Sequence, residues 1–397
     1  MNSQIEPTIK QGKCSYCGDA QVNHKAYYLE NLFSSFVEAH MVRATQLAPW
    51  FIKDFATWVP IGLFNALRKL SLAKFSPDME KASSFRSRVI WEEAQRRGIY
   101  MEQIILGKKP LDWYRANING KMIYFESIPI RPEFLDLKKD WDNKIVLKKE
   151  LMKHGIPVPE FLNLKTRNSK KLSKIFNKLK LPVIVKPRVG SRSRHTITNI
   201  KTLDQFKHGV SIAGQISPHL VVEEHLYGSV CRATVVGGKL AGFYRGQVPS
   251  VVGDGKKTIR ELIKEKDLNR NARVQSVRVG EELYSHIERE GFSIDDVLPE
   301  NVSLNLSHRN GRLFGGTTKE MIDELHPSFI PILEKAADVI GLSVAGFDCI
   351  IPDPTKDESS QRWGIIECNT LPFIDLHYYA LEGKPRNIAG MIWDLWK

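Results

Sequence analysis

Three oxygen-bearing side chains near the C-terminus have the types and the spacing of a divalent-cation site. Glu367 and Asn369 stand two residues apart in the apolar stretch GIIECN, so in a β-strand both would point to one face. Asp348 lies in an earlier apolar stretch, VAGFDCIIPD. If the two stretches pair as an antiparallel hairpin, two carboxylates and an amide meet at one end, and such hard oxygen ligands suit one or two Mg²⁺ ions. The alternative is a pair of surface acids.

A lysine closes a run of buried-type residues in the stretch LPVIVKPRVGSRSR. An unpaired ammonium at Lys186 would be costly, so we expect an anionic partner such as an α- or β-phosphate. In the following loop, Gly190, Ser191 and Ser193 offer N–H and O–H groups that can close over phosphates. Lysine-proline after a strand is common, so this motif alone is weakly specific.

A third motif, VVEEHLYG, places Glu223 and Glu224 at the end of an apolar strand. There the edge of an adenine ring can meet backbone groups and a carboxylate. Acids at strand ends are frequent on protein surfaces, so the order of the motifs along the chain is a stronger signal than any one of them.

These elements need a mixed framework of helices and strands. Helical patterns cover residues 84–99, 141–155, 168–180 (capped by Asn168 or Ser169) and 328–341. Strand-like runs meet at Asn119-Gly120 and at Gly237-Gly238, two dipeptides that favour tight hairpin turns. Antiparallel strands dominate the second half, and the sequence predicts an α+β fold.

Taken in order, the motifs DNK, VIVKPRVGS, VVEEHLYG, VVGDGKKTIRELI, AADVIGLSVAGFD and IIECNTLP resemble the ATP-grasp superfamily. Within it, residues 136–397 are most similar to the branch of cyanophycin synthetase and bifunctional glutathione synthetase. The resemblance implies two α+β subdomains enclosing ATP, with a mobile lid at about residues 160–222. It also implies an enzyme that joins a carboxylate to an amine through an acyl phosphate, releasing ADP and phosphate.

The same resemblance assigns roles to individual residues. It implies nucleotide contacts from Lys144 and Lys186 at the α- and β-phosphates, Glu223 at the adenine amino group, and the backbone of Glu224, His225 and Leu226 around the ring. It implies that Asp348, Glu367 and Asn369 hold Mg²⁺, with Mn²⁺ as an alternative, and that Gly190 to Ser193 form the flexible lid loop. Small-molecule carboxylates and amines, namely amino acids or peptides, would be the substrates.

The sequence departs from the family's pattern at three places. Arg192 to His195 stand where another glycine is usual, Val230 where an acid often contacts the ribose, and Phe373 where a glycine usually follows the proline. The first change predicts either a stiffer lid or an arginine that reaches the transferring phosphate. The second predicts loss of the ribose contact, and the third a reshaped acceptor pocket. An arginine is expected near the acyl phosphate, and the candidates are Arg232, Arg245 and Arg309.

The chain is strongly basic, with a net charge of +13 over 397 residues, which favours a polyanionic partner. Between residues 136 and 201 there are 18 Lys and Arg against 5 Asp and Glu. Interleaved aromatic residues of a stacking platform are missing there, so a nucleotide is favoured over nucleic acid. The alternatives to a ligase are a nucleotide or nucleic-acid binding protein without ligase activity and an acyl kinase-like enzyme.

Residues 1–75 are expected to form a helical extension, and residues 76–135 a substrate-side region preceding the ATP-grasp domain. Cys14-x-x-Cys17 is either half of a zinc site, with His24 and His40 as the other half, or a redox pair. The apolar stretch 28–75 would pack on the core or form a homo-oligomer contact.

The remaining signals concern the compartment. Five cysteines are too few for a disulfide framework, the N-terminus is too polar for a signal peptide, and no apolar run reaches the length of a membrane span. The sequence predicts a cytoplasmic protein without a transmembrane segment.

Overall fold

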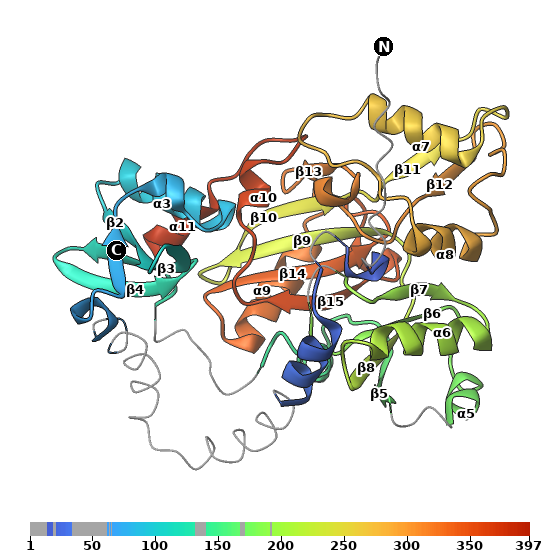
Figure 1. Ribbon diagram of the computed structural model, residues 1–397, viewed down its shortest axis with the longest axis horizontal. Helices are drawn as coiled ribbons and strands as arrows, with labels where there is room; N and C mark the ends of the chain where they lie inside the picture. The colour runs from blue at the N-terminus through green and yellow to red at the C-terminus, as the bar shows by residue number, and fades with distance from the viewer. Residues whose placement is uncertain are drawn as a thin grey trace. The chain divides into compact units, whose positions relative to one another are not determined.

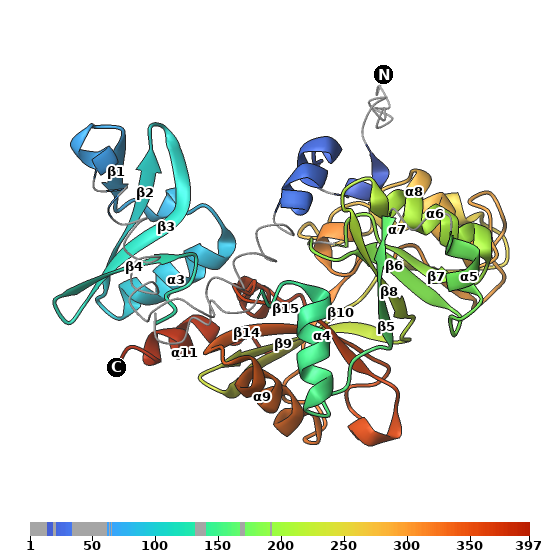
Figure 2. The ribbon, with the colours of Figure 1, turned by 90° about the horizontal axis from the view of Figure 1, so that it is seen from below.

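The computed structural model describes residues 14–18, 21–33, 62, 64, 66–131, 140–166, 171–190 and 193–397. These residues divide into two compact units. Unit 1 comprises Met1–Phe36, Pro159–His225 and Gly246–Thr317, and unit 2 comprises Val37–Val158, Leu226–Arg245 and Thr318–Lys397. Figures 1 and 2 show the elements of each.

Unit 1 contains a four-stranded sheet in the order β5-β8-β6-β7. Its strands are β5 (Phe161–Lys165), β6 (Val183–Pro187), β7 (Ile197–Ile200) and β8 (His219–Glu224). Helix α6 (Leu203–Gly214) packs on this sheet (Figure 1) through Phe206, Val210 and Ala213. A capping box at Thr202 and Gln205 fixes the start of the helix. The short 3-10 turn η1 (Ser15–Cys17) contributes Tyr16 to the same core.

A second core in unit 1 joins the small sheet of β11 (Ser250–Val252) and β12 (Ser303–Asn305) to two helices. These are α7 (Ile259–Leu268) and α8 (Glu281–Arg289). Residues 24–33 are also helical, and α5 (Leu172–Phe176) is shorter than the pattern predicted, with Lys171 as its N-cap. The predicted caps Asn168 and Ser169 lie outside the described residues.

Unit 2 is built around a five-stranded sheet in the order β13-β10-β9-β14-β15. Its strands are β9 (Ser229–Val236), β10 (Lys239–Gly246), β13 (Thr318–Glu320), β14 (Val344–Ile351) and β15 (Gly364–Asn369). Helices α4 (Lys144–Lys153) and α9 (Phe329–Ile340) pack on one face of the sheet (Figure 2). The Gly237-Gly238 turn between β9 and β10 has positive φ at both glycines, as the hairpin prediction required.

The same unit holds a second sheet in the order β1-β2-β3-β4. Its strands are β1 (Ala73–Ser76), β2 (Tyr100–Leu106), β3 (Lys109–Ile118) and β4 (Lys121–Glu126), and α3 (Phe85–Arg96) and α11 (Ile388–Asp394) share its core. Asn119 and Gly120, at φ 50° and 82°, form the predicted turn. The remaining short elements are η2 (Met79–Lys81), η5 (Arg312–Phe314), η6 (Glu358–Ser360) and α10 (Asp375–Tyr378).

Helices and antiparallel strands occur in both units, so the predicted α+β class is confirmed. Within the described ranges, every helix is too short or too polar to cross a bilayer. Most of residues 28–75, including His40, and the loop residues Ser191 and Arg192 lie outside those ranges. The domain boundaries at residues 75 and 135 stay predictions.

Candidate active site

The antiparallel hairpin of β14 and β15 brings the three predicted oxygen donors to one face of the sheet. Asp348 lies directly opposite Glu367, and Gly346 lies opposite Asn369. Because residues two apart along a strand share a face, Asp348, Glu367 and Asn369 form a compact group. The predicted pairing of the two stretches is thereby confirmed.

Alternation along these strands explains why the polar residues share a face. On β14, Ala345, Phe347 and Cys349 are fully buried in the core beneath α4 and α9. Asp348 lies between them in sequence and therefore points to the opposite face. A register shift after Asp348 keeps Ile365 and Cys368 of β15 in the core, so Glu367 stays on the same side as Asp348.

An arginine on the neighbouring strand extends the polar group into a row across three strands. Arg232 on β9 lies opposite Asp348 and donates from Nη2 to Oδ2 at 2.9 Å, with a second bond from Nε to Oδ1. The guanidinium is only 8% exposed. Its Nη1 is buried with no hydrogen-bond partner among the described residues, so this nitrogen can still donate to an anion.

Helix α4 supplies a second cation to the row. Asn143 caps the helix by accepting from the N–H groups of Ile145 and Val146, and Lys144 at the first position places its Nζ 3.4 Å from Glu367. One turn later, the buried Lys148 donates to the carbonyl of Ile366 at 2.6 Å. The sequence analysis missed Lys148, although its spacing of four residues from Lys144 is the signal of a shared helix face.

Opposing effects act on the pKa of the Asp348 carboxyl group. Burial raises its pKa to about 6, the Arg232 guanidinium opposes the rise, and the nearby Glu367 carboxylate adds to it. Two acids held this close repel each other when both are ionised. A cation bound between them would relieve that repulsion.

The chemistry of this group fits a hard divalent ion. Two carboxylates and an amide oxygen are the ligands that Mg²⁺ prefers, with water or phosphate oxygens completing the shell. The side chains of Asp348 and Glu367 are 14% and 24% exposed, so both remain accessible to a ligand. Asn369 has a buried amide nitrogen without a hydrogen-bond partner among the described residues, which leaves its amide available for a further contact.

Unit 1 holds the predicted phosphate and adenine residues as a buried ion pair. Lys186 on β6 and Glu223 on β8 are diagonal neighbours in the sheet, because Ile184 is the residue opposite Glu223. The Lys186 Nζ lies 2.8 Å from Glu223, and the two side chains are 9% and 1% exposed. The expected anionic partner of Lys186 is therefore this glutamate in the structure.

The predicted adenine hinge follows β8 directly. The N–H of Glu224 donates to the Glu160 carbonyl at 2.8 Å, and the N–H of His225 donates to the Pro182 carbonyl at 3.1 Å. These two donors are thus already used by the backbone. The adenine contacts of Glu224, His225 and Leu226 stay predictions.

The predicted lid loop lies between β6 and β7. Gly190 and Ser193 both have positive φ, at 143° and 51°, so the loop makes two left-handed bends. Ser191 lies outside the described residues. At the end of the loop, the buried His195 donates from Nδ1 to the Ile212 carbonyl at 2.8 Å, and burial lowers the pKa of its imidazole to about 4.

The two other candidate arginines have different surroundings. Arg245 is half-buried on β10, and its Nε has no hydrogen-bond partner among the described residues. Arg309, in unit 1, donates to Glu282 at 2.9 Å and to the Tyr16 carbonyl at 2.8 Å. Arg309 thus stabilises the turn at Tyr16.

The segment after β15 contains a feature that the sequence analysis missed. Arg86, at the start of α3, donates to the Leu371 carbonyl and lies 5.1 Å from the centre of the Phe373 ring. Phe373, which replaces the usual glycine, therefore has a cationic partner from residues 76–135. No local motif around Arg86 signals this contact, because the two residues are far apart in the sequence.

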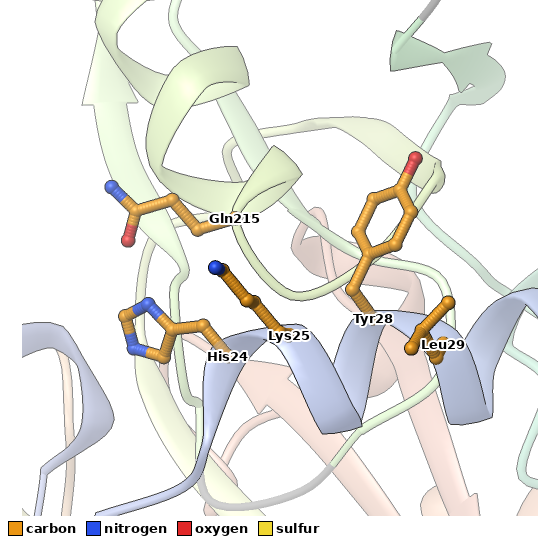
Figure 3. A pocket seen from close by; sticks show the side chains of 5 residues that line it. All are labelled: His24, Lys25, Tyr28, Leu29 and Gln215. Carbon is orange, nitrogen blue, oxygen red and sulfur yellow. The ribbon is translucent and has the colours of Figure 1, made fainter.

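Unit 1 also has a shallow, mainly apolar pocket of about 430 Å³ at the start of helix 24–33 (Figure 3). It is lined by His24, Lys25, Tyr28, Leu29 and Gln215. These residues do not overlap with the predicted nucleotide contacts.

Comparisons with known proteins agree with the interpretation of the motifs. Residues 151–251 match the family model described as D-ala D-ala ligase C-terminus. Cyanophycin synthetase of Trichormus variabilis is 30% identical over 220 residues, which cover 54% of this chain and 24% of that protein. The glutathione biosynthesis bifunctional protein GshAB of Mannheimia succiniciproducens is 28% identical over 267 residues, covering 63% and 35%.

The chain resembles the ATP-grasp ligases. The predicted resemblance to cyanophycin synthetase and to bifunctional glutathione synthetase is thereby confirmed. Among solved structures, a bifunctional glutathione synthetase from Pasteurella multocida aligns over 78% of this chain and 43% of its own, with 21% identity and a TM-score of 0.49. The chain spans about a quarter to a third of the length of these two curated relatives.

Proposed function

We propose that this protein is an ATP-dependent ligase that joins the carboxylate of an amino acid or peptide to an amine. The observation that carries the proposal is the row of Arg232, Asp348 and Glu367 across three adjacent strands, with Asn369 on the same face. Motifs in the order of ATP-grasp ligases and the family match over residues 151–251 support it.

Asp348, Glu367 and Asn369 would hold Mg²⁺, with Mn²⁺ as an alternative. The ion supplies charge neutralisation for the phosphate oxygens of ATP. With the ion held by the carboxylates, Lys144 and Arg232 would exchange their ion pairs for contacts with phosphate oxygens. Lys186 would contact the phosphates and Glu223 the adenine amino group, after their mutual ion pair opens.

The reaction would proceed in two steps. The substrate carboxylate attacks the γ-phosphorus of ATP, forming an acyl phosphate as ADP leaves. An amine then attacks the acyl carbon, phosphate leaves, and the amine loses a proton. Arg232, whose Nη1 is available, and Arg245 are suited to stabilise the negative charge of the acyl phosphate. We assign Arg309 to the Tyr16 turn instead, because its donors are engaged there.

The lid loop with Gly190, Ser191 and Ser193 would cover the phosphates. Excluding water matters because water hydrolyses an acyl phosphate. Phe373 would shape the acceptor side together with Arg86.

A screen for ADP release over amino acids and dipeptides, with mass detection of the amide, tests the proposal. ADP release is expected to require Mg²⁺, one acid and one amine together. A hydroxamate formed with hydroxylamine, without any amide for the amines offered, would support the acyl kinase alternative. Binding of nucleic acid that falls with salt, without ADP release under any substrate pair, would overturn the ligase proposal.

A further inference from the structure

Four side chains from three separate segments of unit 1 converge outside the proposed nucleotide residues. They are Cys14 and Cys17 at either end of the Ser15–Cys17 turn, His24 at the start of helix 24–33, and His195 at the end of the lid loop. One ligand atom from each lies within 4.8 Å of the other three. The sequence suggested His40 as the fourth member, and the structure places His195 there.

The distances within this cluster match tetrahedral zinc. Zinc bonds of about 2.3 Å to sulfur and about 2.05 Å to nitrogen place the two ligand atoms about 3.5 Å apart in a tetrahedron. The observed separations from sulfur to Nε2 are 3.2 Å for Cys17 and His24, 3.5 Å for Cys17 and His195, and 3.7 Å for Cys14 and His195. Together these separations bracket the expected value.

The orientation of His195 is that of a metal ligand. A backbone carbonyl can only accept, so the contact of Nδ1 with the Ile212 carbonyl fixes the proton on that nitrogen. The lone pair of Nε2 then faces both cysteine sulfurs. A second hydrogen bond of this kind usually orients histidines that bind metals. His195 is fully buried and has a φ of 51°, an unusual conformation for a residue other than glycine.

The cysteine turn is held in place by its own hydrogen bonds. The N–H of Cys17 donates to the Cys14 carbonyl at 3.3 Å, and the Gln21 side chain bonds to both the N–H and the carbonyl of Cys14. Gly18 ends the turn at φ 69°, and a Cβ there would lie 2.1 Å from an Arg309 nitrogen. Glycine is therefore required at this position for conformational and for steric reasons.

The segments on either side are also joined by direct hydrogen bonds. The N–H of His195 donates to the Tyr16 carbonyl at 3.0 Å, and Arg194 donates to the Cys17 carbonyl at 3.3 Å. The cysteine turn thus lies against the last residues of the lid loop. A bond from a metal to both segments would fasten them together at their point of contact.

We propose that Cys14, Cys17, His24 and His195 bind one Zn²⁺ as a structural site. Four protein ligands leave no open coordination position, which is the property of structural rather than catalytic zinc. The ion joins the turn at residues 14–17 and His24 to His195 at the end of the lid loop. A site of this composition also explains why a histidine with strained backbone is buried beside two thiols.

A consequence for the ligase follows, and it rests on the proposed function. Gly190 and Ser193 belong to the loop that ends at His195, so the zinc anchors one end of the loop that would cover the phosphates. Removal of zinc is expected to increase hydrogen exchange in residues 193–196 and to raise ADP release in the absence of an amine, because water reaches the acyl phosphate.

The first experiment measures metal content in the purified full-length protein. Elemental analysis should find about one zinc per chain. After removal of zinc with a chelator, titration with Co²⁺ should give the intense visible absorption of tetrahedral cobalt together with a band from cysteine sulfur to cobalt. These readouts do not depend on ligase activity, so failure of the zinc site and failure of the proposed function can be told apart.

Matched variants test the identity of the ligands. Cys17→Ser and His195→Gln should each weaken zinc binding by at least about 100-fold in competition with a chelator, since changes to groups that only orient ligands already cost 10- to 100-fold. His40→Gln should bind zinc like the wild type. His24→Gln gives a second histidine test should His195→Gln fail to fold.

Three results would overturn the proposal. One is a purified protein that contains a disulfide between Cys14 and Cys17 and takes up no zinc after reduction. Another is cobalt binding without the sulfur band. The third is loss of zinc on His40→Gln with normal binding by His195→Gln and His24→Gln.

Discussion

In the five-stranded sheet of unit 2, the two acids Asp348 and Glu367 have separate cationic partners. In the four-stranded sheet of unit 1, Lys186 and Glu223 form a buried pair of opposite charges. The acids of unit 2 are 14% and 24% exposed, and the partners Arg232 and Lys144 approach from different elements. In unit 1, Lys186 and Glu223 are 9% and 1% exposed and depend on each other.

This difference has a physical consequence. A carboxylate that stays in contact with solvent can exchange a protein cation for a metal ion without being left bare, and the buried Arg232 and Lys144 would then need phosphate oxygens as their new partners. A fully buried pair behaves otherwise, since removing one partner leaves the other uncompensated. We therefore expect substitutions in the row of unit 2 to affect activity more than stability, and substitutions in the pair of unit 1 to affect both.

The largest effect is expected for Glu367→Gln. The change removes one negative charge from the metal group while it keeps the shape of the side chain, and it should lower ADP release by at least about 10³-fold. The melting temperature should change little. Glu265→Gln, an exposed glutamate on α7, is the matched control and should keep full activity. A Glu367→Gln protein that is as active as the control would contradict the assignment of Glu367 as a metal ligand.

The second largest effect is the loss of stability that we expect from the substitution Lys186→Met. The buried Glu223 then loses the ammonium that lies 2.8 Å away, and the free energy of unfolding should fall by about 3–5 kcal/mol, measured by urea unfolding. The double variant Lys186→Met with Glu223→Gln should recover much of this loss, because the uncompensated charge is gone, and should remain inactive. Equal losses in the single and the double variants would show that the pair is not coupled.

Acid is expected to destabilise unit 1 through its buried histidines. Burial lowers the pKa of His286 to about 4, and burial together with Arg309 holds the pKa of His308 well below its usual value. The histidines of the unfolded chain bind protons at a higher pH than those of the folded chain. The free energy of unfolding therefore keeps its full value above about pH 6.5 and decreases as the pH falls toward 4. The expected loss for His286 is on the order of 2 kcal/mol.

Urea unfolding between pH 7.5 and 4.5 measures this slope, and His286→Gln should flatten it relative to the wild type. Asp348 in unit 2 contributes with the opposite sign, because its raised pKa makes the folded state bind the proton first as the pH falls through about 6. The variant Asp348→Asn should therefore steepen the loss of stability in acid. The same slope in all three proteins would contradict both assignments.

The smallest effect is expected at the capping box of α7. The Thr258 hydroxyl accepts from the N–H of Glu261, and the Glu261 side chain accepts from the N–H of Thr258. Thr258→Ala should lower the free energy of unfolding by about 1 kcal/mol and leave ADP release unchanged. Thermal unfolding and the ADP assay check this expectation, and a large loss of activity would show that the VGDGKKTIREL motif does more than start a helix.

Local patterns were sufficient for the elements with strong periodicity. The hairpin turns at Asn119-Gly120 and Gly237-Gly238 and the ends of α4 and α9 follow from residues within a few positions of each other. Helix α5 is shorter than the predicted range 168–180, although Ile175, Phe176 and Leu179 pack against the core of unit 1 as the pattern indicated.

In the candidate site, too, some relations between residues follow from the local sequence and others do not. By itself, the sequence determined that Asp348, Glu367 and Asn369 share one face, since strand alternation and a single hairpin fix that relation. Only the tertiary structure decided that Arg232 completes the row, that Lys186 pairs with Glu223 and that His195 joins the two cysteines and His24. These partners are brought together by strand order and by loop packing, which depend on contacts between residues far apart in the chain, and no local pattern encodes such contacts.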